Sequence, residues 1–178
     1  MRCFIAIDLP EEVRKELSAV QRQLPQEVKL IPVKPENIHL TLKFLGEISD
    51  AEINKVKEAL KKLKLGKFKA KLNSLGIFTP DFVRIVWVNL EPKEEFVKLH
   101  EKIDSELEKV GFKKDKSWEN HVTISRIKWL KDKQSFIEKI NKISVEPIEF
   151  IVDSIKLKKS TLTKKGPVYE DIIKINLE

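Results

Sequence analysis

The chain has 178 residues, of which 41% are hydrophobic and 35% are charged. This composition is ordinary for a soluble globular protein, and the length is sufficient to bury a core without disulfide or metal staples. The formal net charge of +7 suits a polyanionic partner, nucleic acid above all. The single cysteine, Cys3, excludes an intrachain disulfide, and its apolar surroundings predict a small core residue.

No apolar stretch approaches the roughly 18 residues that a membrane span needs. The first apolar run is stopped at once by Asp8 and Pro10, which excludes a signal peptide. We therefore expect a cytoplasmic protein without a membrane partner. The length predicts one domain over 1–178, built from two similar lobes.

The predicted elements follow from apolar alternation for strands and from apolar spacing of three to four residues for helices. In chain order they are a strand at 1–9, a helix at 10–24, strands at 28–33 and 38–48, a helix at 49–63, strands at 68–78 and 83–90, a helix at 93–111, a strand at 121–130, a helix at 132–143, and strands at 150–162 and 168–178.

Two local signals mark boundaries between these elements. Ser49 is followed three residues later by Glu52, the spacing of a capping box at a helix start. The segment "TKKGP" at 163–167 has the composition of a hairpin turn. Hairpin-like neighbours and short connections favour an α+β fold with mainly antiparallel sheets.

The chain has only three histidines, and two of them begin the same pattern, "HLT" at 39–41 and "HVT" at 121–123. The two patterns are 82 residues apart (121 − 39), one in each half, which is a weak internal repeat. Because residues i and i+2 of a strand share a face, each histidine lies beside its threonine. The same alternation predicts that Lys43 shares the polar face of His39, while the apolar face packs on the core and is made of Leu40, Leu42 and Phe44.

Two such polar faces across a groove provide a complete acid–base device for phosphate chemistry. Histidine titrates near neutrality, so one imidazole accepts a proton while the other donates one. Each role is typically worth about 10²–10⁴-fold in rate. The hydroxyls of Thr41 and Thr123 donate hydrogen bonds to phosphoryl oxygens, and no metal is needed.

The alternatives are a structural role for both histidines, or a metal site. Two histidines without a convergent cysteine or carboxylate make a weak zinc site, so no metal and no cofactor is expected. His100 is predicted to be a surface residue of the helix at 93–111.

With these motifs, the chain resembles the 2H phosphoesterase superfamily, which is named for its paired His-x-Thr/Ser motifs. Within it, the chain is most similar to the bacterial and archaeal RNA 2′,3′-cyclic phosphodiesterases, also called 2′-5′ RNA ligases. The resemblance spans nearly the whole length and is carried by "RCFIAIDLP", "IHLTLKFLGE", "VRIVWVNL", "NHVTISRI" and "LKKSTLTKKGPVYE".

The resemblance implies a bilobal α+β fold with an antiparallel sheet in each lobe and a central cleft. It implies metal-free hydrolysis of an RNA 2′,3′-cyclic phosphate to a 2′-phosphomonoester, with slight ATP-independent 2′-5′ ligation. His39 would be the proton donor and His121 the proton acceptor. RNA ends such as tRNA fragments would be the partners, and the protein would be a monomer.

Other site residues are predicted less directly. Arg126 follows His121 by five positions, as in the family motif, and would bind phosphate with Thr41 and Thr123. Strict alternation puts Arg126 on the opposite face, unless the strand bulges. Lys43 is a candidate RNA contact, and the candidate base-stacking rings are Phe4, Phe78, Trp118 and Tyr169. The competing hypotheses are a catalytically idle RNA- or nucleotide-binding module and a different substrate within the superfamily.

Overall fold

The structure is a computed structural model that describes residues 1–78 and 83–178. Its strands are β1 (Arg2–Asp8), β2 (Lys29–Pro32), β3 (His39–Glu47), β4 (Phe68–Gly76), β5 (Ile85–Glu91), β6 (Val122–Trp129), β7 (Glu149–Val152), β8 (Ser154–Thr163) and β9 (Gly166–Asn176). Its helices are α1 (Glu11–Gln23), the short 3₁₀ helix η1 (Pro35–Asn37), α2 (Asp50–Lys61), α3 (Lys93–Glu108) and α4 (Lys133–Ile140).

The strands form two antiparallel sheets, each of which serves one lobe. Sheet A has the order β3-β1-β8-β9, and sheet B has the order β2-β6-β5-β4-β7. All pairings within them are antiparallel. The expected α+β fold with two lobes is therefore confirmed.

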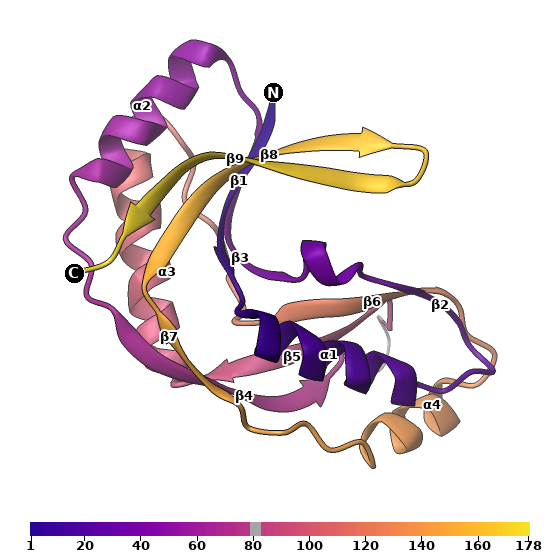
Figure 1. Ribbon diagram of the computed structural model, residues 1–178. Coiled ribbons are helices and arrows are strands. Elements are labelled where there is room, and N and C mark those ends of the chain that lie inside the picture. Colours follow the sequence, from indigo (N-terminus) through magenta and orange to yellow (C-terminus); the bar gives the residue numbers. More distant parts are fainter. Residues whose placement is uncertain (79–82) are drawn as a thin grey trace.

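The helices cover the outer sides of the two lobes (Figure 1). Helices α2 and α3 contact each other, α3 contacts β3, and α2 contacts β9 of sheet A. Helix α1 contacts β6 of sheet B, and α4 lies near it in the lower lobe (Figure 1). The β8–β9 hairpin projects from sheet A over the space between the lobes (Figure 1).

The predicted boundary signals are present. The Ser49 hydroxyl accepts a hydrogen bond from the Glu52 backbone N–H (3.3 Å), and the Glu52 carboxylate accepts one from the Ser49 N–H (2.8 Å), which completes the capping box. Gly166, with φ of +109°, ends the turn of the β8–β9 hairpin. This left-handed conformation favours glycine because it has no Cβ. Cys3 is buried in the core, as predicted.

One predicted strand is wrong in its extent. The segment 150–162 forms two strands, β7 in sheet B and β8 in sheet A, with Asp153 between them. Both strands carry alternating apolar residues, so the pattern gives no sign of the change of sheet. The break passes the chain from one lobe to the other, and Leu177 near the end donates its backbone N–H to Asp153 O (2.7 Å).

Among the described residues, no helix is long and apolar enough to span a membrane. The helices are instead amphipathic, with one buried stripe each. In α1, for example, Val13, Leu17 and Val20 are fully buried, at the spacing of three to four residues that the sequence shows.

Candidate active site

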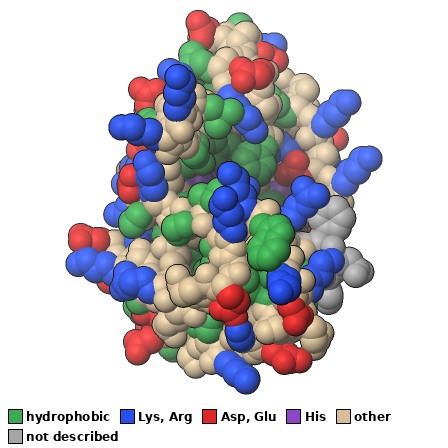
Figure 2. Space-filling model, turned by 90° about the vertical axis from the view of Figure 1, so that its right-hand side faces the viewer, with side chains coloured by type: hydrophobic (Ala, Val, Ile, Leu, Met, Phe, Trp, Pro, Cys, Tyr) green, Lys and Arg blue, Asp and Glu red, His purple; other side chains and the backbone are tan. Residues whose placement is uncertain are grey.

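The two His-x-Thr segments lie on different sheets and line one cavity. His39 and Thr41 come from the start of β3 in sheet A, and Thr123 comes from β6 in sheet B, with His121 just before it. All four line a cavity of about 830 Å³ between the lobes. Figure 2 shows this hollow, with hydrophobic side chains along its wall and Lys and Arg side chains around it.

His39 is held by two hydrogen bonds and two aromatic contacts. Its Nδ1 lies 2.6 Å from the backbone oxygen of Asn37, and its Nε2 lies 2.9 Å from Thr41 Oγ1. Since a carbonyl oxygen only accepts, Nδ1 carries the proton and Nε2 accepts from the threonine hydroxyl in the neutral ring. Phe4 and Tyr169 pack against the imidazole at centroid distances of 5.0 and 5.3 Å.

His121 repeats this arrangement in the second half of the chain. Its Nδ1 lies 2.9 Å from the backbone oxygen of Glu119, again two residues earlier, so this nitrogen carries the proton. Phe78 and Trp87 flank the ring at centroid distances of 4.8 and 6.4 Å. Both imidazoles therefore have the same tautomer, in which the unprotonated Nε2 can exchange a proton with a bound molecule once, for His39, the Thr41 hydroxyl turns away.

Burial is the main influence on the titration of both histidines. It lowers the pKa of His39 and of His121 below the ordinary value of about 6.5. For His39, the hydrogen bond to Asn37 and the charge of Asp8 act in the opposite direction, while Lys158 and His121 lower the pKa further. The mutual effect of the histidines means that charging one disfavours charging the other.

A β-bulge interrupts both strands of the His-x-Thr segments at the same position. In β3, Leu42 is the extra residue between the pairs Ala6↔Thr41 and Ile5↔Lys43. In β6, Ile124 is the extra residue between Trp87↔Thr123 and Val86↔Ser125. A bulge of this kind reverses the alternation beyond it. Two consecutive residues are therefore buried in each strand: Leu42 and Lys43 in β3, and Ile124 and Ser125 in β6.

The bulges decide where the remaining predicted residues lie. Arg126 is exposed and lines the cavity with His121 and Thr123, because the bulge turns it to their face. Phe44 was predicted to pack on the core, and this is wrong: it is 71% exposed and lines the cavity. The bulge after Thr41 is the physical reason.

Lys43 and His100 also differ from their predicted surroundings. Lys43 was a candidate RNA contact on an exposed polar face, but it is 2% exposed and paired with Asp104 and Asp115. His100 was predicted to be a surface residue, but it is buried, and its Nε2 lies 3.0 Å from Asp115 Oδ2. Neither residue is free to meet solvent as the sequence suggested.

The four aromatic residues considered for base stacking, Phe4, Phe78, Trp118 and Tyr169, all line the cavity. Gln21, which sequence reasoning missed, and Trp118, which it considered only for stacking, hold its walls. The Gln21 amide donates to Val33 O (2.8 Å) and to Ile124 O (2.6 Å), which ties α1 to the bulge of β6. The Trp118 indole N–H donates to Thr41 O (3.1 Å) beside the bulge of β3.

The chain matches the family model described as LigT like Phosphoesterase twice, over residues 7–87 and 86–169. Each match contains one His-x-Thr segment, in agreement with the internal repeat. A protein named RNA 2′,3′-cyclic phosphodiesterase from Methanocaldococcus jannaschii is 38% identical over 97% of this chain and 98% of its own length. A protein of the same name from Thermotoga maritima is 35% identical over 100% of this chain and 96% of its own length.

Solved structures share the fold. A crystal structure of a Thermus thermophilus protein superposes with a TM-score of 0.85 at 29% identity, covering 99% of this chain and 98% of that one. Escherichia coli LigT complexed with 3′-AMP superposes with a TM-score of 0.79 at 23% identity, covering 99% and 97%. The two-lobed arrangement is thus a fold already seen in crystals.

Proposed function

Because the chain belongs to the LigT-like phosphoesterase family, we propose that it is an RNA 2′,3′-cyclic phosphodiesterase that acts through His39 and His121. The observation that carries the proposal is the pair of equivalent half-sites that face one cavity. Each supplies an imidazole with an unprotonated Nε2 and a threonine hydroxyl. The relatives at 38% and 35% identity bear this activity as their name.

In the proposed reaction, water attacks the phosphorus of the cyclic ester. His121 Nε2 accepts the water proton as the oxygen–phosphorus bond forms. The bond from phosphorus to O3′ breaks, and protonated His39 donates its Nε2 proton to O3′. The product is a 2′-phosphomonoester with a free 3′-hydroxyl, and the proton accepted equals the proton donated. The assignment of acid and base follows the family pattern.

Three further side chains would bind the phosphate. Thr41 and Thr123 supply hydroxyl donors for the non-bridging oxygens, where negative charge increases in the transition state. Arg126 supplies a guanidinium on the same wall, and its planar fork matches two phosphoryl oxygens. In the free protein the Thr41 hydroxyl donates to His39 Nε2, so it must turn toward the phosphate when His39 is protonated.

The same site would support ligation to a small extent. A 5′-hydroxyl RNA end in place of water would attack the cyclic phosphate and give a 2′-5′ linkage without ATP. Water is far more concentrated, so hydrolysis dominates. We further propose a monomeric cytoplasmic protein whose substrates are RNA fragments with cyclic phosphate ends, tRNA fragments among them.

Incubation with an RNA oligonucleotide ending in 2′,3′-cyclic phosphate, with and without EDTA, tests the proposal. We expect a 2′-phosphomonoester at equal rates in both reactions. A 3′-phosphate product would overturn the assignment of O3′ as the leaving oxygen. Binding of the cyclic end without any opening would instead support the catalytically idle module.

A further inference from the structure

An ionic cluster lies in the wall of the cavity, where Lys43 and Asp115 are among the lining residues, and the proposed reaction does not use it. The Lys43 ammonium is 2% exposed and donates to the carboxylate of Asp104, to Asp115 Oδ1 (3.1 Å) and to Lys113 O (3.0 Å). Burial of an ammonium is costly unless every donor is paired with an acceptor of suitable charge. Lys43 meets this condition, because its three N–H groups have three acceptors.

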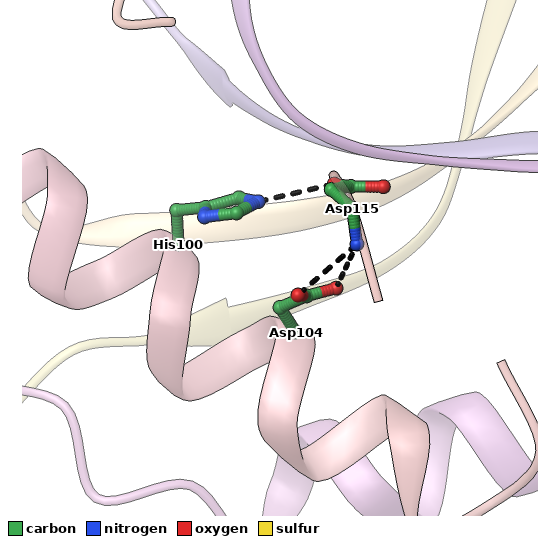
Figure 3. Close-up of side chains that lie close together, drawn as sticks. All are labelled: His100, Asp104 and Asp115. Carbon is green, nitrogen blue, oxygen red and sulfur yellow. Dashed lines mark hydrogen bonds and ion pairs between the residues drawn. The ribbon is translucent and has the colours of Figure 1, made fainter. Parts of the chain in front are cut away.

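The cluster continues to an aromatic pair. The Asp115 backbone N–H donates to both Asp104 oxygens (3.2 and 3.4 Å), and His100 Nε2 lies 3.0 Å from Asp115 Oδ2 (Figure 3). The His100 ring stacks on Trp118 at 4.7 Å, with 9° between the planes. The Trp118 indole N–H in turn donates to Thr41 O (3.1 Å).

A metal site is the first alternative for such a group. The ligand atoms of His100, Asp104 and Asp115 lie within 4.8 Å of one another, a separation that would suit a divalent ion. The Lys43 ammonium, however, already contacts both carboxylates and supplies the positive charge that an ion would bring.

The placement of the cluster indicates what it does. Lys43 stands two residues after Thr41 on β3, which carries His39 in sheet A. The segment 112–120 leaves α3 and ends immediately before His121, which leads into β6 of sheet B. Contacts at Lys113, Asp115 and Trp118 bind this segment to β3 from one end to the other. The cluster therefore joins the backbone of one half-site to the segment that delivers the histidine of the other.

The second half-site has no such cluster at the equivalent position. Ser125 follows the bulge of β6 as Lys43 follows that of β3, and it is fully buried. Its hydroxyl has no hydrogen-bond partner in the described part of the chain. Within the described residues, the ionic cluster is thus a feature of one half-site only. We call the link that it makes between β3 and the segment before His121 the joint.

We propose that Lys43 is a positioning residue, which acts through Asp115 and Trp118 to hold His39 and His121 at the separation that the reaction needs. This inference rests on the proposed function. A displacement of about 1 Å at a catalytic group can cost about 10²-fold in rate, so loss of the joint affects turnover more than binding.

The test compares two variants with one control. Trp118→Phe keeps an aromatic ring for stacking on His100 and removes only the N–H that holds Thr41. Lys43→Met removes the ammonium that binds Asp104, Asp115 and the Lys113 carbonyl. Leu60→Ala is destabilised in the buried core of α2, at a residue that neither lines the cavity nor belongs to the cluster. We expect kcat on cyclic-phosphate RNA to fall at least tenfold in both variants, with KM within about twofold and activity near wild type in the control.

A second measurement does not depend on turnover. The chain has only three histidines, so their NMR titrations are resolvable. In Trp118→Phe the half-sites separate and admit water, so the pKa of His39 rises toward its ordinary value, whereas in Leu60→Ala it is unchanged. If Lys43→Met does not fold, Trp118→Phe decides the question alone.

Several results would contradict these proposals. A loss of kcat no larger than in Leu60→Ala, or a rise in KM at unchanged kcat, overturns the positioning role. If the wild-type protein opens no cyclic phosphate, the proposed function fails. The titration then still tests the joint, because an unchanged His39 pKa in Trp118→Phe overturns it independently.

Discussion

Phe44 and Arg126 occupy the same position in the two half-sites. Each stands five residues after its histidine, and each is turned onto the wall of the cavity by a bulge three residues after that histidine. The repeated backbone geometry thus places a neutral ring on the wall from sheet A and a guanidinium on the wall from sheet B. The two half-sites therefore differ in charge at this one equivalent position.

Arg126→Ala should weaken substrate recognition at the charged side. A charge-assisted hydrogen bond contributes about 1.5–3 kcal/mol, which corresponds to a fall in kcat/KM of about 10–100-fold. Arg126→Lys should recover only part of it, since an ammonium cannot form the paired bonds of a guanidinium. Arg22→Ala, an exposed arginine outside the cavity, is the matched control for net charge. Equal effects of Arg126→Ala and Arg22→Ala on steady-state rates would show that Arg126 acts only through overall charge.

Replacement of either histidine should remove turnover and spare binding. His39→Ala and His121→Ala are each expected to lower kcat by about 10²–10⁴-fold, the usual contribution of one general acid or base. Titration calorimetry with an RNA ending in 2′-phosphate should give similar affinities for wild type and variants. Near-wild-type turnover of either variant would exclude the two-histidine mechanism.

The dependence of rate on pH should be bell-shaped, because one imidazole must be charged and the other neutral. Burial lowers the pKa of both rings, so the midpoint of the acidic limb should lie at a pH below the ordinary histidine pKa of about 6.5. Activity is lost there as the base becomes protonated. Initial rates from pH 4 to 10 at substrate well below KM check this, because kcat/KM reports the pKa values of the free enzyme, and an acidic limb above pH 7 would contradict it.

Asp8→Asn should move the alkaline limb of that profile to lower pH. After burial and the hydrogen bond to Asn37, the positive charge of Lys158 lowers the pKa of His39, and the negative charge of Asp8 raises it. Loss of the Asp8 carboxylate removes the negative charge that raises the pKa of His39. It also removes an ion-pair partner of Lys158, 2.9 Å away, so less of the positive charge of Lys158 is neutralised. Both changes lower the pKa of the proposed acid, so it loses its proton earlier as pH rises.

Asp171→Asn is the control for this shift, since Asp171 pairs the same lysine at 2.7 Å but has no direct influence on His39. Its alkaline limb should move less than that of Asp8→Asn. Equal displacement in the two variants would mean that the charge of Lys158 alone governs His39.

Alternation in the sequence correctly predicted the faces of the site residues that precede the bulges, but not of those that follow them. His39 with Thr41, and His121 with Thr123, precede the extra residues and share the cavity as expected. After each bulge the alternation of inward and outward side chains is reversed. Strict alternation therefore predicts a core position for Phe44 and cannot decide on which face of the strand Arg126 lies. A bulge is selected by the fit of the strand to its neighbours, such as Ala6 and Ile5 beside β3, and leaves no local mark.

The buried cluster, by contrast, has a signal that the sequence contains. Phe96, His100 and Asp104 are spaced by four residues, so the two polar side chains lie on the apolar stripe of α3. A histidine and an aspartate on that stripe indicate a buried polar contact rather than a surface. Their partner Lys43 comes from a strand 61 residues earlier than Asp104, and only the tertiary fold brings them together.

Gly76→Ala should disturb the packing behind His121. A Cβ at Gly76 would lie 2.7 Å from Trp87 Cη2 and 2.9 Å from Cζ2, closer than packed atoms approach. The rigid indole must shift, and since it flanks His121 at 6.4 Å, the imidazole loses its support. Overpacking of this kind costs about 1–3 kcal/mol, so thermal unfolding should fall by several degrees and kcat should decrease.

Gly66→Ala is the matched control, because nothing lies within 4 Å of a Cβ at Gly66 and its backbone conformation suits any residue. Its melting temperature should be unchanged or slightly raised, since alanine reduces the entropy of the unfolded chain. Calorimetric scans and steady-state kinetics on the two variants separate the outcomes. If Gly76→Ala melts lower but keeps the wild-type kcat and pH profile, Trp87 supports the fold of sheet B without supporting the position of His121.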